Sequence, residues 1–245
     1  MESAGTDFRS KLRRVTFSIA STGLRRTLAD TATLLLSYRP ERDRSFDARY
    51  GTDTAGSVQP DQLGITDTEA RGQAILYLPS PTRVTRWMFD NIGVDHREYS
   101  LVDLGCGKGR VLLVASDYPF RQIVGVEISP DLAAIARQNI DRYQPPSRQC
   151  RQVSVANVDA TRFEFPGTNL LLHLYHPFEP AITIAVLRNL QRSLEASPRK
   201  VAIGYLLYSS AVAAVEAAFA EFPWLTRRRY EQSVLGQYDW LFYSN

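Results

Sequence analysis

From residue 100 onward, short apolar runs alternate with segments in which apolar residues recur every three or four positions. The apolar runs predict buried strands at 100–104, 122–127, 151–155, 169–175 and 200–207. The periodic segments predict helices at 110–116, 129–140, 179–194 and 209–221. A further helix is expected before the first strand, at 80–94, with Ser80 as its cap. Strands and helices that alternate in this way build a mostly parallel sheet with helices on both faces. Two last strands, 224–232 and 237–243, are separated only by Ser233–Gly236 and must pair antiparallel. The pattern therefore predicts a doubly wound α/β domain whose seven-stranded sheet ends in an antiparallel hairpin.

The first 70 residues follow a different pattern. Residues 8–38 place apolar side chains between arginines and lysine at helical spacing, which predicts one or two amphipathic helices. We expect their apolar side to pack on the domain that follows, although a basic amphipathic helix can also lie on an anionic membrane. Residues 39–68 are first charged and then rich in turn-forming residues, so a loop is expected there. The chain thus divides into a helical N-terminal extension and loop, residues 1–70, and a domain at 71–245.

Composition narrows the class of protein. Only two cysteines are present, Cys106 and Cys150, so the sequence holds neither a disulfide framework nor the paired spacing of a zinc site, and no metal is expected. No stretch approaches the roughly 18–20 uninterrupted apolar residues of a membrane span. The charged N-terminus does not resemble a secretory signal. We therefore expect a soluble, cytoplasmic protein. The net charge of +3 argues only weakly for an anionic partner.

A glycine-rich run, VDLGCGKGR at residues 102–110, lies where the first strand meets the next helix. Glycines at 105, 107 and 109 allow a sharp turn and the close approach of a ligand. Their spacing, G-x-G-x-G, differs from the G-x-G-x-x-G of dinucleotide sites. Asp103 precedes the first glycine by two positions, and a carboxylate there suits a ligand with a cationic amino-acid end rather than a pyrophosphate. S-adenosylmethionine is such a ligand.

Two more acidic residues follow later strands. Glu127 ends the second strand, where a carboxylate can accept hydrogen bonds from ribose hydroxyls. Asp159 follows the third strand, where a carboxylate could meet an adenine amino group. Each feature is weak alone, because glycine turns and solvated acids are common. Together, and in this order along the sheet, they favour a nucleoside-binding site.

The run VDLGCGKGR resembles motif I of the class I S-adenosylmethionine-dependent methyltransferases, whose fold is Rossmann-like. The resemblance covers about residues 75–245. It implies that Asp103 and the three glycines approach the methionine part of the cofactor, that Glu127 holds the ribose, and that Asp159 with Ala160 borders the adenine. By the same resemblance the cofactor site comprises Asp103, Gly105, Cys106, Gly107, Gly109, Glu127, Ile128, Asp159, Ala160 and Tyr77. The segment Tyr77–Pro81 has a weaker likeness to Dot1-like lysine methyltransferases, in which an upstream loop closes over the cofactor.

The acceptor side is expected after the fourth strand, at His176–Pro180, where this family places its substrate-facing motif. Amino-methylating relatives often have Asn or Asp followed by two prolines and an aromatic residue. Here His176 replaces the amide or acid and Phe178 supplies the ring, a departure that makes nucleic-acid bases less suitable acceptors. We therefore take Tyr175, His176 and Phe178 as the candidate catalytic residues. His176 has the pKa range of a general base, or it merely caps the strand. His173 is expected to be structural.

The sequence thus predicts a methyltransferase that acts on an unidentified acceptor, either a protein side chain or a small molecule. Tyr77–Pro81 slightly favours a protein. One alternative is a non-catalytic cofactor-binding adaptor that uses residues 8–36 to reach a membrane or a partner. The other is an NAD-dependent oxidoreductase, which the glycine spacing and the terminal hairpin disfavour.

Overall fold

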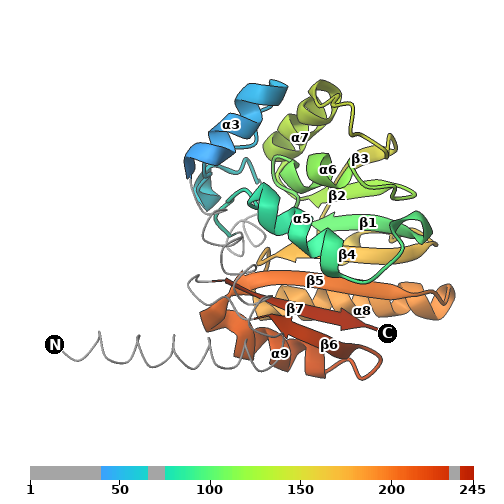
Figure 1. Cartoon of the computed structure of the whole chain (residues 1–245). Helices are drawn as coiled ribbons and strands as arrows, with labels where there is room; N and C mark the ends of the chain where they lie inside the picture. Colours follow the sequence, from blue (N-terminus) through green and yellow to red (C-terminus); the bar gives the residue numbers. More distant parts are fainter. Residues whose placement is uncertain (1–39, 66–74, 232–237) are drawn as a thin grey trace, which may run out of the picture.

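A mixed β-sheet runs through the molecule (Figure 1), and the computed structural model describes residues 40–65, 75–231 and 238–245. Within these ranges the sheet has seven strands in the order β3-β2-β1-β4-β5-β7-β6. The strands are β1 (Tyr99–Leu104), β2 (Ile123–Glu127), β3 (Val153–Asn157), β4 (Asn169–Tyr175), β5 (Val201–Tyr208), β6 (Thr226–Glu231) and β7 (Tyr238–Ser244). The first five pair in parallel, whereas β7 is antiparallel to both β5 and β6. The predicted doubly wound sheet with an antiparallel C-terminal pair is confirmed.

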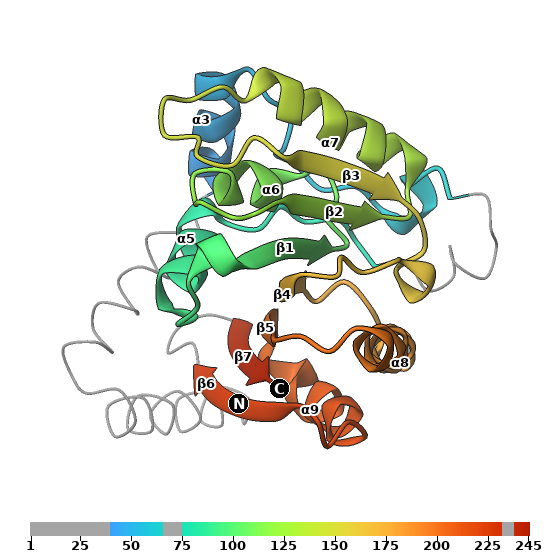
Figure 2. The same ribbon diagram turned by 90° about the vertical axis from the view of Figure 1, so that its right-hand side faces the viewer.

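Helices cover both faces of the sheet (Figure 2). One face carries α5 (Thr82–Asn91), α6 (Arg110–Ala115) and α7 (Pro130–Arg142), and the other carries α8 (Pro180–Ala196) and α9 (Val212–Ala220). Each face has its own apolar core: Phe89 and Leu112 belong to the first, Leu187 and Phe219 to the second. Short 3-10 turns connect these elements, namely η1 (Pro60–Gln62), η2 (His96–Glu98), η3 (Ala160–Arg162) and η4 (Ser209–Ala211). None of the helices in the described ranges has the length and apolar character that a bilayer crossing requires.

Local chemistry explains where the helices near the site begin. Ser129 caps α7, because its hydroxyl oxygen accepts a hydrogen bond from the Leu132 N–H, and Pro130 occupies the first turn. The expected cap of α5, however, is wrong. Its N-cap is Pro81 in an extended conformation, and the helix begins at Thr82. The first intrahelical hydrogen bond runs from the Thr85 N–H to the carbonyl of Pro81 at 3.0 Å, so Pro81 takes the capping position that was expected of Ser80.

The loop expected at 39–68 is also wrong in part, because α3 (Pro40–Tyr50) and η1 lie within it. The mostly charged sequence of α3 contains two aromatic residues one helical turn apart, Phe46 and Tyr50. Both pack on Tyr143 just after α7, with ring centroids 5.8 and 4.7 Å away. Tertiary packing of this aromatic pair stabilises a helix whose sequence alone looks like a linker. The helices predicted at 8–38 and the turn at Ser233–Gly236 lie outside the described residues.

Candidate functional site

A pocket opens at the carboxyl ends of β1, β2, β3 and β4, the edge at which ligands bind in open α/β sheets. Its walls include the expected residues Tyr77, Asp103, Gly105, Cys106, Gly107, Glu127, Ile128, Asp159, Ala160, Tyr175, His176 and Phe178. Gly109 is not part of the lining. It adopts a left-handed conformation at the N-cap of α6, where a Cβ would lie 3.1 Å from the Cβ of Ala136. The folded chain therefore gathers all but one of the predicted site residues around a single cavity.

The glycine loop, residues 105–109, fits closely between two neighbouring side chains. Gly105 and Gly107 have φ angles of +75° and +53°, a region that L side chains rarely adopt. A Cβ on Gly105 would come within 2.7 Å of the Cβ of Pro177, and one on Gly107 would overlap the ring of Tyr77. Glycine is needed at both positions for backbone conformation and for space.

Glu127 joins the glycine loop to the start of α7. One carboxylate oxygen accepts a hydrogen bond from the Gly107 N–H at 2.8 Å, and the other accepts from the Ser129 N–H at 2.9 Å. Burial raises the pKa of Glu127, and these two amides oppose that shift. Each oxygen of a carboxylate has a second lone pair, so Glu127 retains capacity to accept from a ligand hydroxyl.

Asp103 has a partner that the sequence analysis missed. Its Oδ1 lies 2.7 Å from Nδ1 of His173, which was expected to be merely structural, and both side chains are buried. The Oδ2 atom of Asp103 is also buried, and no residue in the described ranges hydrogen-bonds to it. The parallel register of β1 and β4 sets Asp103 directly opposite His173. This register is the feature from which the contact could have been predicted.

Asp159 and its neighbours form the wall beyond β3. One oxygen of Asp159 accepts hydrogen bonds from the N–H and the hydroxyl of Thr161, both at 2.8 Å, and thereby caps η3. Asn157 donates to the carbonyl of Glu127 at 2.8 Å and to that of Ile128 at 3.1 Å. The ends of β2 and β3 are thus tied together, with Ile128 and Ala160 on the pocket side.

His176 has a strained backbone at the opposite wall. Among the described residues it is the one non-glycine with a positive φ, +40°. Its N–H donates to the carbonyl of Leu206 at 2.8 Å, and its ring meets Tyr208 edge-on at 5.3 Å. Burial lowers the pKa of His176, with the charge of Glu179 opposing. Non-glycine residues in this region of φ are costly and concentrate at functional sites.

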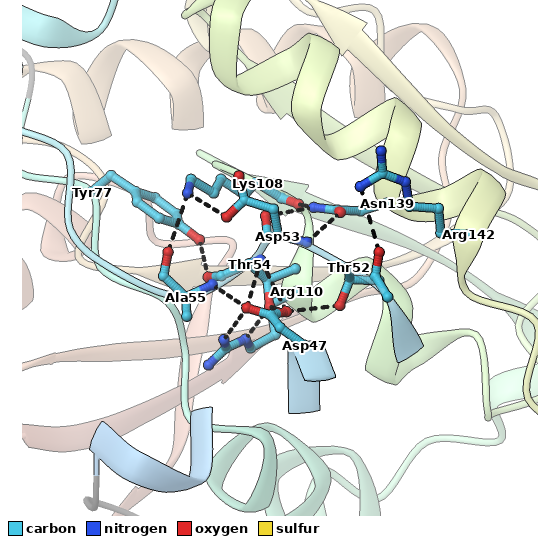
Figure 3. A network of polar contacts seen from close by, with 11 residues as sticks. Asp47, Thr52, Asp53, Thr54, Ala55, Tyr77, Lys108, Arg110, Asn139 and Arg142 are labelled. Carbon is cyan, nitrogen blue, oxygen red and sulfur yellow. Dashed lines mark hydrogen bonds and ion pairs between the residues drawn. The ribbon is translucent and has the colours of Figure 1, made fainter. Parts of the chain in front are cut away.

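The segment 40–65, here called the clasp, binds the glycine loop from outside the sheet (Figure 3). Arg110 is fully buried and donates from Nε to the hydroxyl of Thr54 at 2.7 Å, with the Asp47 carboxylate 3.8 Å from its NH2 group. Lys108 forms an ion pair with Asp53 at 2.8 Å. The two basic residues of the glycine-rich run therefore have partners in the clasp.

Further contacts fix the clasp to α7 and to the pocket wall. Asn139 of α7 accepts from the N–H of Asp53 and donates to the carbonyls of Asp53 and Lys108, at 2.8 to 2.9 Å. Tyr77 donates its hydroxyl to the carbonyl of Thr54 at 2.8 Å. Burial raises the pKa of Tyr77, so the phenol stays protonated and remains a donor. Sequence reasoning missed this network because it treated 39–68 as a linker. The acidic residues Asp47 and Asp53 of that segment could have indicated partners for the basic residues Lys108 and Arg110.

Comparison with known proteins finds matches in the part of the chain that forms the pocket. Residues 101–197 match the family model described as a methyltransferase domain. A protein-lysine N-methyltransferase of Saccharolobus islandicus (strain REY15A) is 36% identical over 67 residues, which are 27% of this chain and 41% of that protein. A release factor glutamine methyltransferase of Vibrio cholerae serotype O1 is 36% identical over 72 residues, 28% of this chain and 25% of that protein. The chain thus spans less than half the length of these curated relatives.

A solved structure shows the same fold. The ribosomal protein L11 methylase of Lactobacillus delbrueckii subsp. bulgaricus superposes with a TM-score of 0.50 at 13% sequence identity. The superposition covers 67% of this chain and 77% of that one. At so low an identity, the likeness concerns the arrangement of strands and helices.

Proposed function

From the premise that residues 101–197 form a class I S-adenosylmethionine-dependent methyltransferase domain, we propose that the protein methylates a nitrogen atom of a protein side chain. The domain match confirms the family predicted from VDLGCGKGR, and S-adenosylmethionine as the cofactor of that family. The protein acceptor is supported by the two curated relatives, whose names are protein-lysine N-methyltransferase and release factor glutamine methyltransferase. A small molecule is the alternative acceptor.

The pocket suits this cofactor chemically. The single observation that carries the methyltransferase activity is that Asp103, Glu127 and Asp159, from three successive strand ends, line one cavity with two side-chain-free glycines. The unpartnered Oδ2 of Asp103 suits the ammonium group of an amino acid, and Glu127 suits ribose hydroxyls. Asp159, Ala160 and Ile128 suit the adenine, while Tyr77 and Cys106 complete the wall. When bound, the cofactor supplies a methyl group already activated by a sulfonium.

The chain's own residues then have to align the acceptor and exclude water. Positioning of this kind can supply about 7–11 kcal/mol of a reaction barrier. In our proposal Tyr175 and Phe178 line the acceptor's path, and the ring of His176 takes the proton that an ammonium must lose before its nitrogen can accept a methyl group. A lowered pKa keeps His176 unprotonated at neutral pH, as this role requires.

The clasp belongs to the same functional unit in this proposal. Its contacts with Lys108, Arg110 and Asn139 hold the outer side of the glycine loop. We propose residue 70 as the boundary between the extension and the domain. The clasp then belongs to the extension and packs on the domain. Both cysteines are buried free thiols, which suits the reducing cytoplasm as the proposed compartment.

Binding is the first test of the proposal. Calorimetry with S-adenosylmethionine and S-adenosylhomocysteine should give affinities that weaken by roughly ten- to a hundredfold in Asp103→Ala and Glu127→Ala, the usual effect of losing a hydrogen bond to a charged group. A folded wild-type protein that binds neither ligand but binds NADH would contradict the proposal.

Transfer is the second test. The wild-type protein, S-adenosylmethionine labelled in its methyl group, and a cell extract should give label in protein that hydrolysis releases as a methylated amino acid. Label confined to small molecules would favour the alternative acceptor. Tight cofactor binding with no transfer to any fraction would instead indicate a non-catalytic adaptor.

A further inference from the structure

Asp103 of β1 and His173 of β4 are paired in the register of the two parallel strands. Their side chains therefore project from the same face of the sheet, and Oδ1 of Asp103 lies 2.7 Å from Nδ1 of His173. The two side chains are 3% and 1% exposed. Solvent is thus excluded from a hydrogen bond that lies directly behind the wall of the cofactor pocket.

The chemistry of the pair assigns the proton. An ionised carboxylate can only accept, so Nδ1 of His173 carries the hydrogen and donates it to Oδ1. This leaves Oδ2, which is buried and has no hydrogen-bond partner within the described part of the chain. Asp103 lines the pocket, whereas His173 does not. The hydrogen bond of His173 therefore reaches a ligand only through Asp103.

Aspartate needs such a partner to keep one orientation. The torsion that turns its carboxylate is broad and has no sharp preferred angle. A hydrogen bond to Oδ1 restricts that rotation and sets the direction of Oδ2. The ring of His173 is itself held in place, since it packs edge-on against Trp240 of β7 with centroids 5.9 Å apart.

We propose that His173 is a positioning residue that orients Oδ2 of Asp103 toward the ammonium group of the cofactor's amino-acid part. The inference rests on the proposed function, because it requires S-adenosylmethionine in this pocket. It predicts that a change of His173 alters the affinity only for ligands that carry the amino-acid part.

Two ligands separate positioning from general damage. S-adenosylhomocysteine has the amino-acid part, and 5′-methylthioadenosine lacks it while keeping the adenosine. We expect His173→Leu to weaken S-adenosylhomocysteine about tenfold or more, the usual effect of a lost bond to a charged group. Binding of 5′-methylthioadenosine should not change. His173→Asn, which keeps an amide N–H near the position of Nδ1, should restore much of the preference for S-adenosylhomocysteine.

Trp240→Phe is the packing control. It keeps an aromatic ring beside His173 and leaves the bond to Asp103 in place, so the affinities for both ligands should stay close to those of the wild-type protein. His173→Ala replaces the leucine variant if that variant does not fold. The proposal is wrong if the folded His173 variants weaken the binding of both ligands equally, or of neither. A wild-type protein that binds neither ligand would overturn the proposed function itself, which is a distinguishable result.

Discussion

The ring of Tyr77 occupies the space into which a side chain at Gly107 would project. Gly107 also has a φ of +53°, so Gly107→Ala meets both backbone strain and a collision. We expect the free energy of unfolding to fall by about 2–5 kcal/mol, the combined scale of a strained residue and an overpacked one. Binding of S-adenosylhomocysteine should be lost because the loop has to move. Urea unfolding and calorimetry measure the two effects.

Gly51 offers a matched control. Its φ is +67°, yet nothing lies within 4 Å of the place where its Cβ would be. Gly51→Ala should therefore cost only the left-handed conformation, about 1–2 kcal/mol, and should leave binding intact. Combining Gly107→Ala with Tyr77→Ala should cost less than the sum of the two single changes, because the collision is gone. Additive costs would show that Tyr77 does not limit the space at Gly107.

Asp47 should be the most important acid of the clasp. It is the counter-charge of buried Arg110 and also accepts hydrogen bonds from Thr52, Thr54 and Ala55. Removing one partner of a buried ion pair typically costs about 3–5 kcal/mol, so Asp47→Ala should lower the free energy of unfolding by about that amount.

Asp53→Ala is the comparison for this change. The Asp53 side chain is 57% exposed, and the buried ammonium of Lys108 keeps its bond to the carbonyl of Ala55, so the loss of Asp53 should cost about 1–3 kcal/mol, less than the loss of Asp47. Urea unfolding of both variants under the same conditions gives the comparison. Equal costs would mean that burial of Arg110 does not depend on Asp47.

The sheet could be predicted because its strands, apart from the arginine-rich β6, are short apolar or alternating runs with their own local signal. β4 begins and ends where the sequence places it, at Asn169 and Tyr175. The helix α3 could not be predicted in this way. Its two apolar residues, Phe46 and Tyr50, stabilise a helix only by packing on Tyr143, which is far away in sequence.

The site shows the same division. The glycine loop and the acids at the strand ends were predicted as neighbours because parallel strands end at one edge of the sheet. Their individual roles remain predictions. The bond between Asp103 and His173 depends on the register of β1 and β4, and the bond between Arg110 and Thr54 depends on where the clasp docks. Neither register nor docking is encoded in local periodicity.

Both thiols should be unreactive in the folded protein. Burial raises the pKa of Cys106 and of Cys150. The thiolate is the reactive form, so a raised pKa removes it at neutral pH. We expect Ellman's reagent to modify neither cysteine in the native protein and both in denaturant. Rapid native labelling that disappears in Cys106→Ala and is blocked by S-adenosylhomocysteine would mean that the pocket wall opens more than the structure shows.

His176 should make methyl transfer depend on pH. Burial lowers its pKa below the ordinary value near 6.5, and Glu179 opposes the shift. The folded protein thus binds fewer protons at this ring than the unfolded chain does, so the contribution of His176 to stability falls as the pH falls through 6.5 toward the lowered pKa. The unprotonated ring is also the form that can accept a proton. We therefore expect kcat/KM to decline in acid with an inflection below 6.5.

His176→Asn tests this role without disturbing the backbone, since asparagine tolerates a positive φ comparatively well. A lost general base lowers kcat by about a hundred- to ten-thousandfold, and the variant's pH profile should lack the inflection below 6.5. Glu179→Gln removes the opposing charge, so it should keep the inflection but move it to lower pH. If His176→Asn retained the wild-type kcat and pH profile, His176 would serve only to end β4 through its bond to Leu206. The proton would then leave the acceptor by another route.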